Sequence, residues 1–206
     1  MTALRIRAAA LVAASATALA LSSCSSTATK TAVEDHSSHG SSATAAQSGA
    51  HNEDDVLFAQ MMIPHHQQAV TLAGMVPDRS TNPEVRALAV KISAEQQPEI
   101  ATMKDLLGQW GIKPDEMTHE SGHAGMTMQG MVGDDTLVKL EGLKGPDFDA
   151  LWLQSMIGHH QGAIEMATIE AEAGKSPEMT ALARSIISAQ QAEIDQMKQM
   201  LQASGG

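Results

Sequence analysis

Two copies of the pattern Met-x-x-His-His contain the side chains of this sequence that are best suited to chemistry. They are Met62, His65 and His66 in the first copy and Met156, His159 and His160 in the second. On a helix, residues three and four positions apart share one face, so each thioether would lie beside its imidazoles. A thioether is a soft ligand and imidazole a borderline one. Without thiolate they suit copper better than zinc, iron or magnesium.

The two copies belong to an internal repeat. Residues 55–111 align without a gap with residues 149–205, at a constant offset of 94 positions. Such self-similarity is typical of a duplicated structural unit. In each repeat, apolar residues recur at steps of three and four residues in two stretches separated by a break, which predicts a helical hairpin. Asn82 and Ser176, each directly before a proline, are predicted to cap the second helix of their hairpin.

Two hairpins bury their apolar faces best against one another. We therefore expect an all-α fold, a four-helix bundle with near twofold pseudosymmetry. The helical domain would span residues 53–206, with the first repeat at 53–111 and the second at 147–205. Residues 112–146 cross between the halves and are rich in glycine, so we expect them to form a loop.

Polar residues interrupt the apolar stripes at core positions. Besides His65 and His159, they are Gln96, Glu99, Gln190 and Glu193. Buried polar groups are costly unless they are paired, and counting outward from each hairpin turn brings these groups near the height of the histidines. We expect a polar, thioether-containing layer in the middle of the bundle, where the Gln and Glu side chains support the metal ligands. The alternative is that the histidines are structural and hydrogen-bonded to Gln96 or Glu99.

Further thioethers and imidazoles could add to this chemistry. Met103 and Met197 occupy seam positions about two turns from the histidine layer, where either metal binding or core packing would explain them. The crossover between the repeats holds a second Met/His cluster, which could capture copper or belong to a loop without a site. Its members are His119, His123, Met126, Met128 and Met131.

The N-terminal residues resemble a bacterial lipoprotein signal. Residues 1–23 have a basic start and an Ala/Leu/Val stretch that is too short and too rich in alanine for a good membrane span. They end before Cys24, the one cysteine of the chain, in a Leu-Ser-Ser-Cys sequence that resembles a lipobox. We expect lipidation of Cys24, a flexible tether over residues 24–52, and anchoring on the extracytoplasmic face of the membrane.

Composition excludes some classes of function. The 206 residues carry a formal net charge of −11 and only 2% aromatic residues, which argues against a nucleic-acid-binding surface. The sequence has no Ser-His-Asp or Cys-His arrangement and no phosphate-binding glycine loop. The 14 methionines and nine histidines are the compositional feature that calls for an explanation.

These motifs resemble the bacterial family known as domain of unknown function 305, which has a ferritin-like helical fold. The resemblance rests on Met-x-x-His-His at residues 62–66 and 156–160 and on Gln-x-x-Glu-Ile-x-x-Met at residues 96–103 and 190–197. It covers about residues 53–204. It implies an exported protein that binds copper through Met and His and contributes to copper resistance. It does not imply di-iron chemistry, because the Glu-x-x-His pairs of such sites are absent.

The sequence leads to one expected function and two alternatives. We expect a copper-binding lipoprotein that sequesters Cu(I), or also Cu(II), or hands it to an unidentified trafficking partner, and that is not an enzyme. In the first alternative the protein is a helical interaction module, whose polar layer only fixes the register of the helices. In the second it is a metal-dependent oxidoreductase, which would need an open coordination position.

Overall fold

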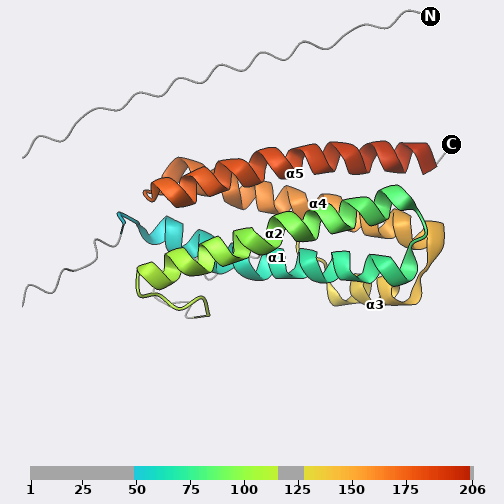
Figure 1. The fold of residues 1–206 in the computed structure, drawn as a ribbon, viewed down its shortest axis with the longest axis horizontal. Helices are drawn as coiled ribbons and strands as arrows, with labels where there is room; N and C mark the ends of the chain where they lie inside the picture. Colours follow the sequence, from blue (N-terminus) through green and yellow to red (C-terminus); the bar gives the residue numbers. More distant parts are fainter. Residues whose placement is uncertain (1–48, 116–127, 205–206) are drawn as a thin grey trace, which may run out of the picture. The chain divides into compact units, whose positions relative to one another are not determined.

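Five α-helices make up the part of the chain that the computed structural model describes, residues 49–115 and 128–204 (Figure 1). They are α1 (Glu53–Arg79), α2 (Pro83–Gln109), α3 (Asp134–Gly142), α4 (Gly145–Ala173) and α5 (Pro177–Ser204). The described residues contain no strand. The four long helices are those predicted from the repeat, so the expected all-α class is confirmed.

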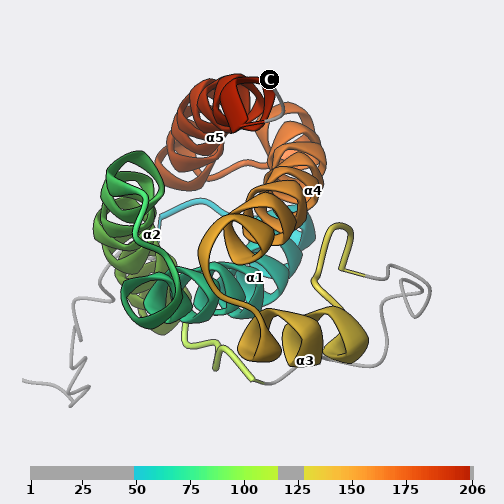
Figure 2. The same cartoon turned by 90° about the vertical axis from the view of Figure 1, so that its right-hand side faces the viewer.

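The four long helices form two hairpins that pack against each other through α1 and α4 (Figure 2). These two helices run antiparallel, because the indole Nε1 of Trp152 near the start of α4 donates to the carbonyl of Leu72 in the second half of α1, at 2.9 Å. One apolar cluster lies around Trp152 and Phe148, and a second lies around Phe58 and Met179. The bundle therefore has an apolar core on each side of its middle.

The predicted helix caps are present. The side-chain oxygen of Asn82 accepts hydrogen bonds from the backbone N–H groups of Glu84 and Val85, at 2.9 and 3.5 Å. The hydroxyl of Ser176 accepts from the N–H of Met179 at 3.2 Å. Each cap satisfies N–H groups that the first turn of a helix leaves without partners. Each hairpin turn therefore ends at its predicted cap residue, directly before the proline that begins the second helix.

The expectation that residues 112–146 form a loop is wrong for residues 134–142. They form α3, which lies outside the four-helix bundle (Figure 2). Leu140 is fully buried, and its carbonyl accepts from the Arg79 side chain at 3.2 Å. Packing against the bundle therefore stabilises a helix too short to form alone. The glycines that suggested a loop, Gly133 and Gly142, lie at its two ends.

Membrane attachment is not visible in the described residues. None of the helices described has the length and hydropathy that a bilayer span requires. The predicted signal peptide, Cys24 and most of the tether lie outside the described residues. Lipid anchoring therefore stays a prediction from the sequence.

A buried acidic pair joins the start of α1 to the end of α4. Asp55 accepts hydrogen bonds from the backbone N–H groups of Asn52, Lys175 and Ser176, at 2.6, 3.1 and 2.9 Å. Glu170, which is 1% exposed, lies near Asp55. Burial, and after it the neighbouring carboxyl group of Asp55, raises the pKa of Glu170 to about 8.

Stability is expected to fall as the pH rises, because folded Glu170 holds its proton more tightly than the unfolded chain does. The contribution is complete below the ordinary pKa of 4.5 and is lost as the pH rises through about 8. Between pH 6 and 9 this group alone should cost about 2 kcal/mol. Glu170→Gln should remove most of that dependence in urea unfolding at the two pH values. An equal loss of stability between pH 6 and 9 in both proteins would contradict a raised pKa of Glu170.

Candidate metal centre

The four repeated histidines lie in one buried row across the middle of the bundle. All four are fully buried. The rings of His65 on α1 and His159 on α4 meet at the centre, with centroids 3.7 Å apart and planes tilted by 36°. His66 and His160 flank them, at 6.5 and 6.3 Å from their neighbours in sequence. Since His65 and His159 occupy equivalent repeat positions, the pseudo-twofold axis passes between their rings.

The predicted pairs of metal ligands are therefore two halves of one continuous layer. We call them the first and the second half. The first half consists of Met62, His65, His66, Gln96 and Glu99, and the second half consists of Met156, His159, His160, Gln190 and Glu193.

Each outer histidine donates a hydrogen bond to a glutamate of its own hairpin. His66 Nε2 lies 2.8 Å from Glu99 Oε2, and His160 Nε2 lies 2.7 Å from Glu193 Oε2. An ionised carboxylate can only accept, so the proton lies on Nε2 in both rings. In both rings Nδ1 has no partner. This arrangement, in which a carboxylate orients an imidazole whose other nitrogen is free, is the usual support of a metal-binding histidine.

The two central histidines are held in their neutral form. Burial, and after it the neighbouring His66, lowers the pKa of His65 to about 3. Burial and the neighbouring histidines also lower the pKa of His159 well below its ordinary value. His65 Nε2 donates to the carbonyl of Gln129 at 3.0 Å, which leaves its Nδ1 free, and neither ring nitrogen of His159 has a partner. Both rings can therefore offer a lone pair to a metal.

The four methionines predicted as ligands in the two repeats are fully buried. Met62 and Met103 belong to one apolar cluster, and Met156 and Met197 belong to the other. Among the described residues, no three side chains of His, Cys, Asp or Glu are arranged to hold a metal ion together. A site formed by thioethers and imidazoles would favour Cu(I) over harder ions.

The layer also holds two buried amides that lack protein partners. Gln96 and Gln190 are 2% and 3% exposed, and neither polar atom of either side chain is hydrogen-bonded. An unsatisfied buried polar group costs about 1–3 kcal/mol. No hydrogen bond therefore connects these glutamines to the histidines that they are predicted to support. Their polar atoms add to the unpaired imidazole nitrogens of the layer.

Two contacts of the layer were not predicted. Lys91 Nζ on α2 lies 3.0 Å from Glu193 Oε1 and 3.3 Å from Glu95 Oε2. Burial alone would raise the pKa of Glu193, but hydrogen bonds from His160 and Lys91 more than offset this and lower it. The second unpredicted contact is the carbonyl of Gln129 on His65. A backbone carbonyl from a crossover leaves no signal in the residue pattern.

Gln129 belongs to a short strap, residues 128–132, that crosses α1 and α4. Gln68 of α1 holds the strap through two hydrogen bonds to Val132. The side-chain amide group of Gln68 donates to the carbonyl of Val132 at 2.9 Å, and its side-chain oxygen accepts from the N–H of Val132 at 2.7 Å. Gly130 has φ +80°, and a Cβ on Gly130 would collide with the carbonyl of Gly158. A Cβ on Gly162 would likewise collide with the carbonyl of Gln129. The glycines therefore allow the strap backbone to touch the backbone of α4.

The crossover cluster is only partly in the described residues. Met128 is half-buried and packs against the apolar cluster that contains Met62 and Met103. Met131 is half-buried at the other end of the strap. His119, His123 and Met126 lie outside the described residues, so the predicted capture of copper there stays a prediction.

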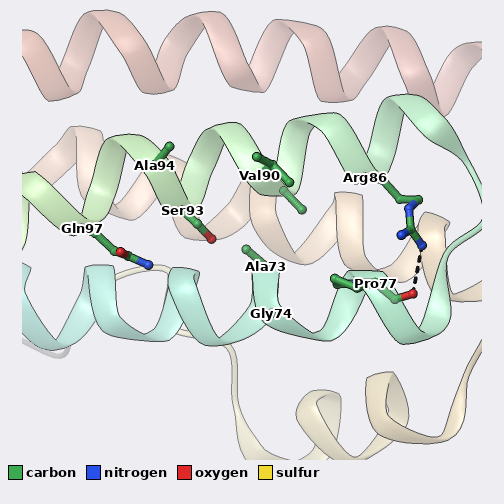
Figure 3. A pocket seen from close by; sticks show the side chains of 9 residues that line it. Ala73, Gly74, Pro77, Arg86, Val90, Ser93, Ala94 and Gln97 are labelled. Carbon is green, nitrogen blue, oxygen red and sulfur yellow. Dashed lines mark hydrogen bonds between the residues drawn. The ribbon is translucent and has the colours of Figure 1, made fainter.

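A surface groove between α1 and α2 carries none of this chemistry. Figure 3 shows Ala73 and Pro77 of α1 facing Val90 and Ser93 of α2, with Arg86 bound to the carbonyl of Pro77. Its lining contains no histidine or methionine. The buried layer is therefore the candidate site.

Solved structures of similar proteins share this fold. A DUF305 protein from Streptomyces coelicolor, described as a candidate secreted protein, is 33% identical, with a TM-score of 0.69 over 74% of this chain and 94% of that one. A DUF305 fragment from Deinococcus radiodurans is 36% identical, with a TM-score of 0.65 over 74% of this chain and 97% of that one. CopM in its Cu(I)-bound form is 35% identical, with a TM-score of 0.62 over 74% and 98%.

Sequence comparison leads to the same group. An uncharacterized protein of Acanthamoeba polyphaga mimivirus is 37% identical over 54 residues, which is 26% of this chain and 36% of the length of that relative. Residues 55–201, which include both hairpins and the whole histidine layer, match the domain of unknown function DUF305. The chain thus belongs to the DUF305 family.

Proposed function

We propose that this protein binds copper as cargo, Cu(I) in preference to Cu(II), in the buried Met/His layer. The observation that carries the proposal is the state of the four histidines. They are buried, three are held through Nε2 with Nδ1 free, and the fourth has both nitrogens free. A layer that only fixed helix register would be expected to pair these atoms with one another.

The similar structures support copper as the cargo. CopM has been solved in a Cu(I)-bound and a Cu(II)-bound form, and its chains are 35% and 37% identical to this one over nearly their whole length. Both forms fit an imidazole-rich layer, whereas the thioethers favour the reduced ion. We propose a binding role in copper homeostasis or resistance rather than catalysis.

The proposal includes a location outside the cytoplasm. The Streptomyces neighbour is described as a candidate secreted protein. The lipobox-like sequence before Cys24 would add a lipid anchor to this export. Copper would then be sequestered, or passed to a partner protein, at the outer face of the membrane.

Competition of the purified full chain with a calibrated Cu(I) chelator tests the proposal. The informative variant is Met62→Leu with Met156→Leu, because leucine preserves buried volume and costs less than about 1.5 kcal/mol per site while removing the thioether. We expect Cu(I) affinity to fall by roughly tenfold or more, in the range seen when a metal site loses supporting groups.

Met179→Leu is the matched control, since Met179 is also fully buried but lies near the start of α5, about three turns before Gln190 of the layer. It should leave the Cu(I) affinity unchanged. Copper should also raise the melting temperature of the unaltered protein, because a ligand that binds the native state stabilises it. Unchanged melting, together with equal affinity of all three proteins, would favour the interaction module instead.

A further inference from the structure

The two halves of the layer differ in one charged contact, despite the repeat. Glu193 in the second half receives a hydrogen bond from Lys91, which reaches across from α2 to α5. The repeat offset of 94 places Ser185 at the position equivalent to Lys91 and Glu99 at the position equivalent to Glu193. Among the described residues, no lysine or arginine lies within ion-pair distance of Glu99. Only one of the two histidine–glutamate pairs is therefore bridged to a cation.

We propose that Lys91 makes the halves unequal, so that the first half takes Cu(I) before the second. The inference rests on the proposed function. Lys91 acts as a positioning residue, because it touches Glu193 and not the metal ligands.

Charge balance is the first reason. When Cu(I) binds His66, its single positive charge is offset by the Glu99 carboxylate that holds the ring. When Cu(I) binds His160, the carboxylate of Glu193 is already shared with an ammonium group. The ammonium group is partly exposed and screened by water, so it should weaken cation binding in the second half by a modest amount.

Hydrogen bonding is the second reason, and it acts in the same direction. Both oxygens of Glu193 are engaged, one by His160 at 2.7 Å and one by Lys91 at 3.0 Å. In the part of the chain that the structure describes, the Glu99 carboxylate accepts a hydrogen bond from His66 alone. A carboxylate that is not shared makes the imidazole it orients a stronger donor to a metal.

Access also distinguishes the halves. The Glu99 side chain is 16% exposed, whereas that of Glu193 is 2% exposed and has Lys91 beside it. A cation that enters from the solvent would therefore meet the first half more readily. Lys91 and Glu95 have side chains that are 44% and 41% exposed, so water screens both charges, and the hydrogen bond from Lys91 to Glu193 carries the difference between the halves.

The strap does not reverse this order. The carbonyl of Gln129 occupies Nε2 of His65 in the first half, and nothing occupies the nitrogens of His159 in the second. His65 still offers Nδ1, and a hydrogen bond from Nε2 to a carbonyl supports such a donor. Both halves therefore keep a central lone pair, and Lys91 is the charged difference between them.

Exchanging the lysine between the halves tests the proposal. In Lys91→Ser with Ser185→Lys, the ammonium group should face Glu99 instead of Glu193. Anaerobic Cu(I) titration of the histidine-¹⁵N-labelled full chain would follow the ring signals of His66 and His160. In the unaltered protein, His66 should respond at a roughly two- to fivefold lower Cu(I) concentration, a size set by a partly screened ion pair. In the exchange variant, His160 should respond first.

The single variant Lys91→Gln separates a tuning role from a merely structural one. In this variant the ring signals of His66 and His160 should respond at similar Cu(I) concentrations, whether or not the substitution changes the melting temperature. The same order of response in all three proteins, or simultaneous response in the unaltered protein, would overturn the inference but leave copper binding in place. If no ring signal responded to Cu(I), the proposed function would fail and the inference with it.

Discussion

Replacing His65, His66, His159 and His160 together by alanine is expected to weaken Cu(I) binding by at least about 100-fold, because even loss of supporting contacts around a metal can cost 10- to 100-fold. The four rings supply every imidazole nitrogen of the layer, so only thioether ligands would remain there. Competition with a Cu(I) chelator measures the loss. His51→Ala is the matched control, since His51 stacks on Trp110 outside the layer at a centroid distance of 4.4 Å.

The fourfold variant removes the histidine donors of Glu99 and of the buried Glu193, so its folding must be checked by circular dichroism. His159→Ala is the gentler variant, because neither ring nitrogen of His159 takes part in a hydrogen bond that the substitution would break. It should lower the affinity while leaving the helical content unchanged. Full affinity in a folded fourfold variant would place the copper in the Met/His crossover instead.

Gly162→Ala is expected to destabilise the protein by about 1–3 kcal/mol, the usual cost of inserting a group into a packed site. The added Cβ would collide with the carbonyl of Gln129, and this collision involves backbone, which no side-chain rotation relieves. The strap should move away from α4. Its hydrogen bond to His65 should then be lost, which the ¹⁵N signal of that ring would report.

Gly158→Ala is the control for this substitution. Gly158 lies one turn earlier on α4, and a Cβ there meets nothing within 4 Å. Because alanine favours helix over glycine by about 1 kcal/mol, this variant should be as stable as the unaltered protein or more stable. Urea unfolding of both variants measures the difference in their stability. Equal stability of the two would show that the strap is not held against the α4 backbone.

The fold was largely predictable from the sequence, because duplication repeats the same signals twice. The apolar stripes, the proline breaks and the caps at Asn82 and Ser176 each occur at equivalent positions. Helix α3 was missed for the opposite reason. It occurs once, it is short, and its stability depends on burying Leu140 against the bundle, which no local pattern reveals.

The candidate site was predictable in its members but not in its connections. Residue spacing brought the histidines level with Gln96 and placed Glu99 less than about a turn away, whereas the structure puts Glu99 in contact with His66. Lys91 was missed because it is a lysine on the outer side of α2, where a charged residue needs no explanation. The carbonyl of Gln129 was missed because backbone groups are the same at every residue.

The most direct measurement is anomalous diffraction at the copper edge from crystals of the Cu(I)-loaded protein. We expect density for copper within the bundle, between α1, α2, α4 and α5, beside Nδ1 of the layer histidines and the sulfur of Met62 or Met156. Copper found only at the surface or in the crossover, with the layer unchanged, would contradict it.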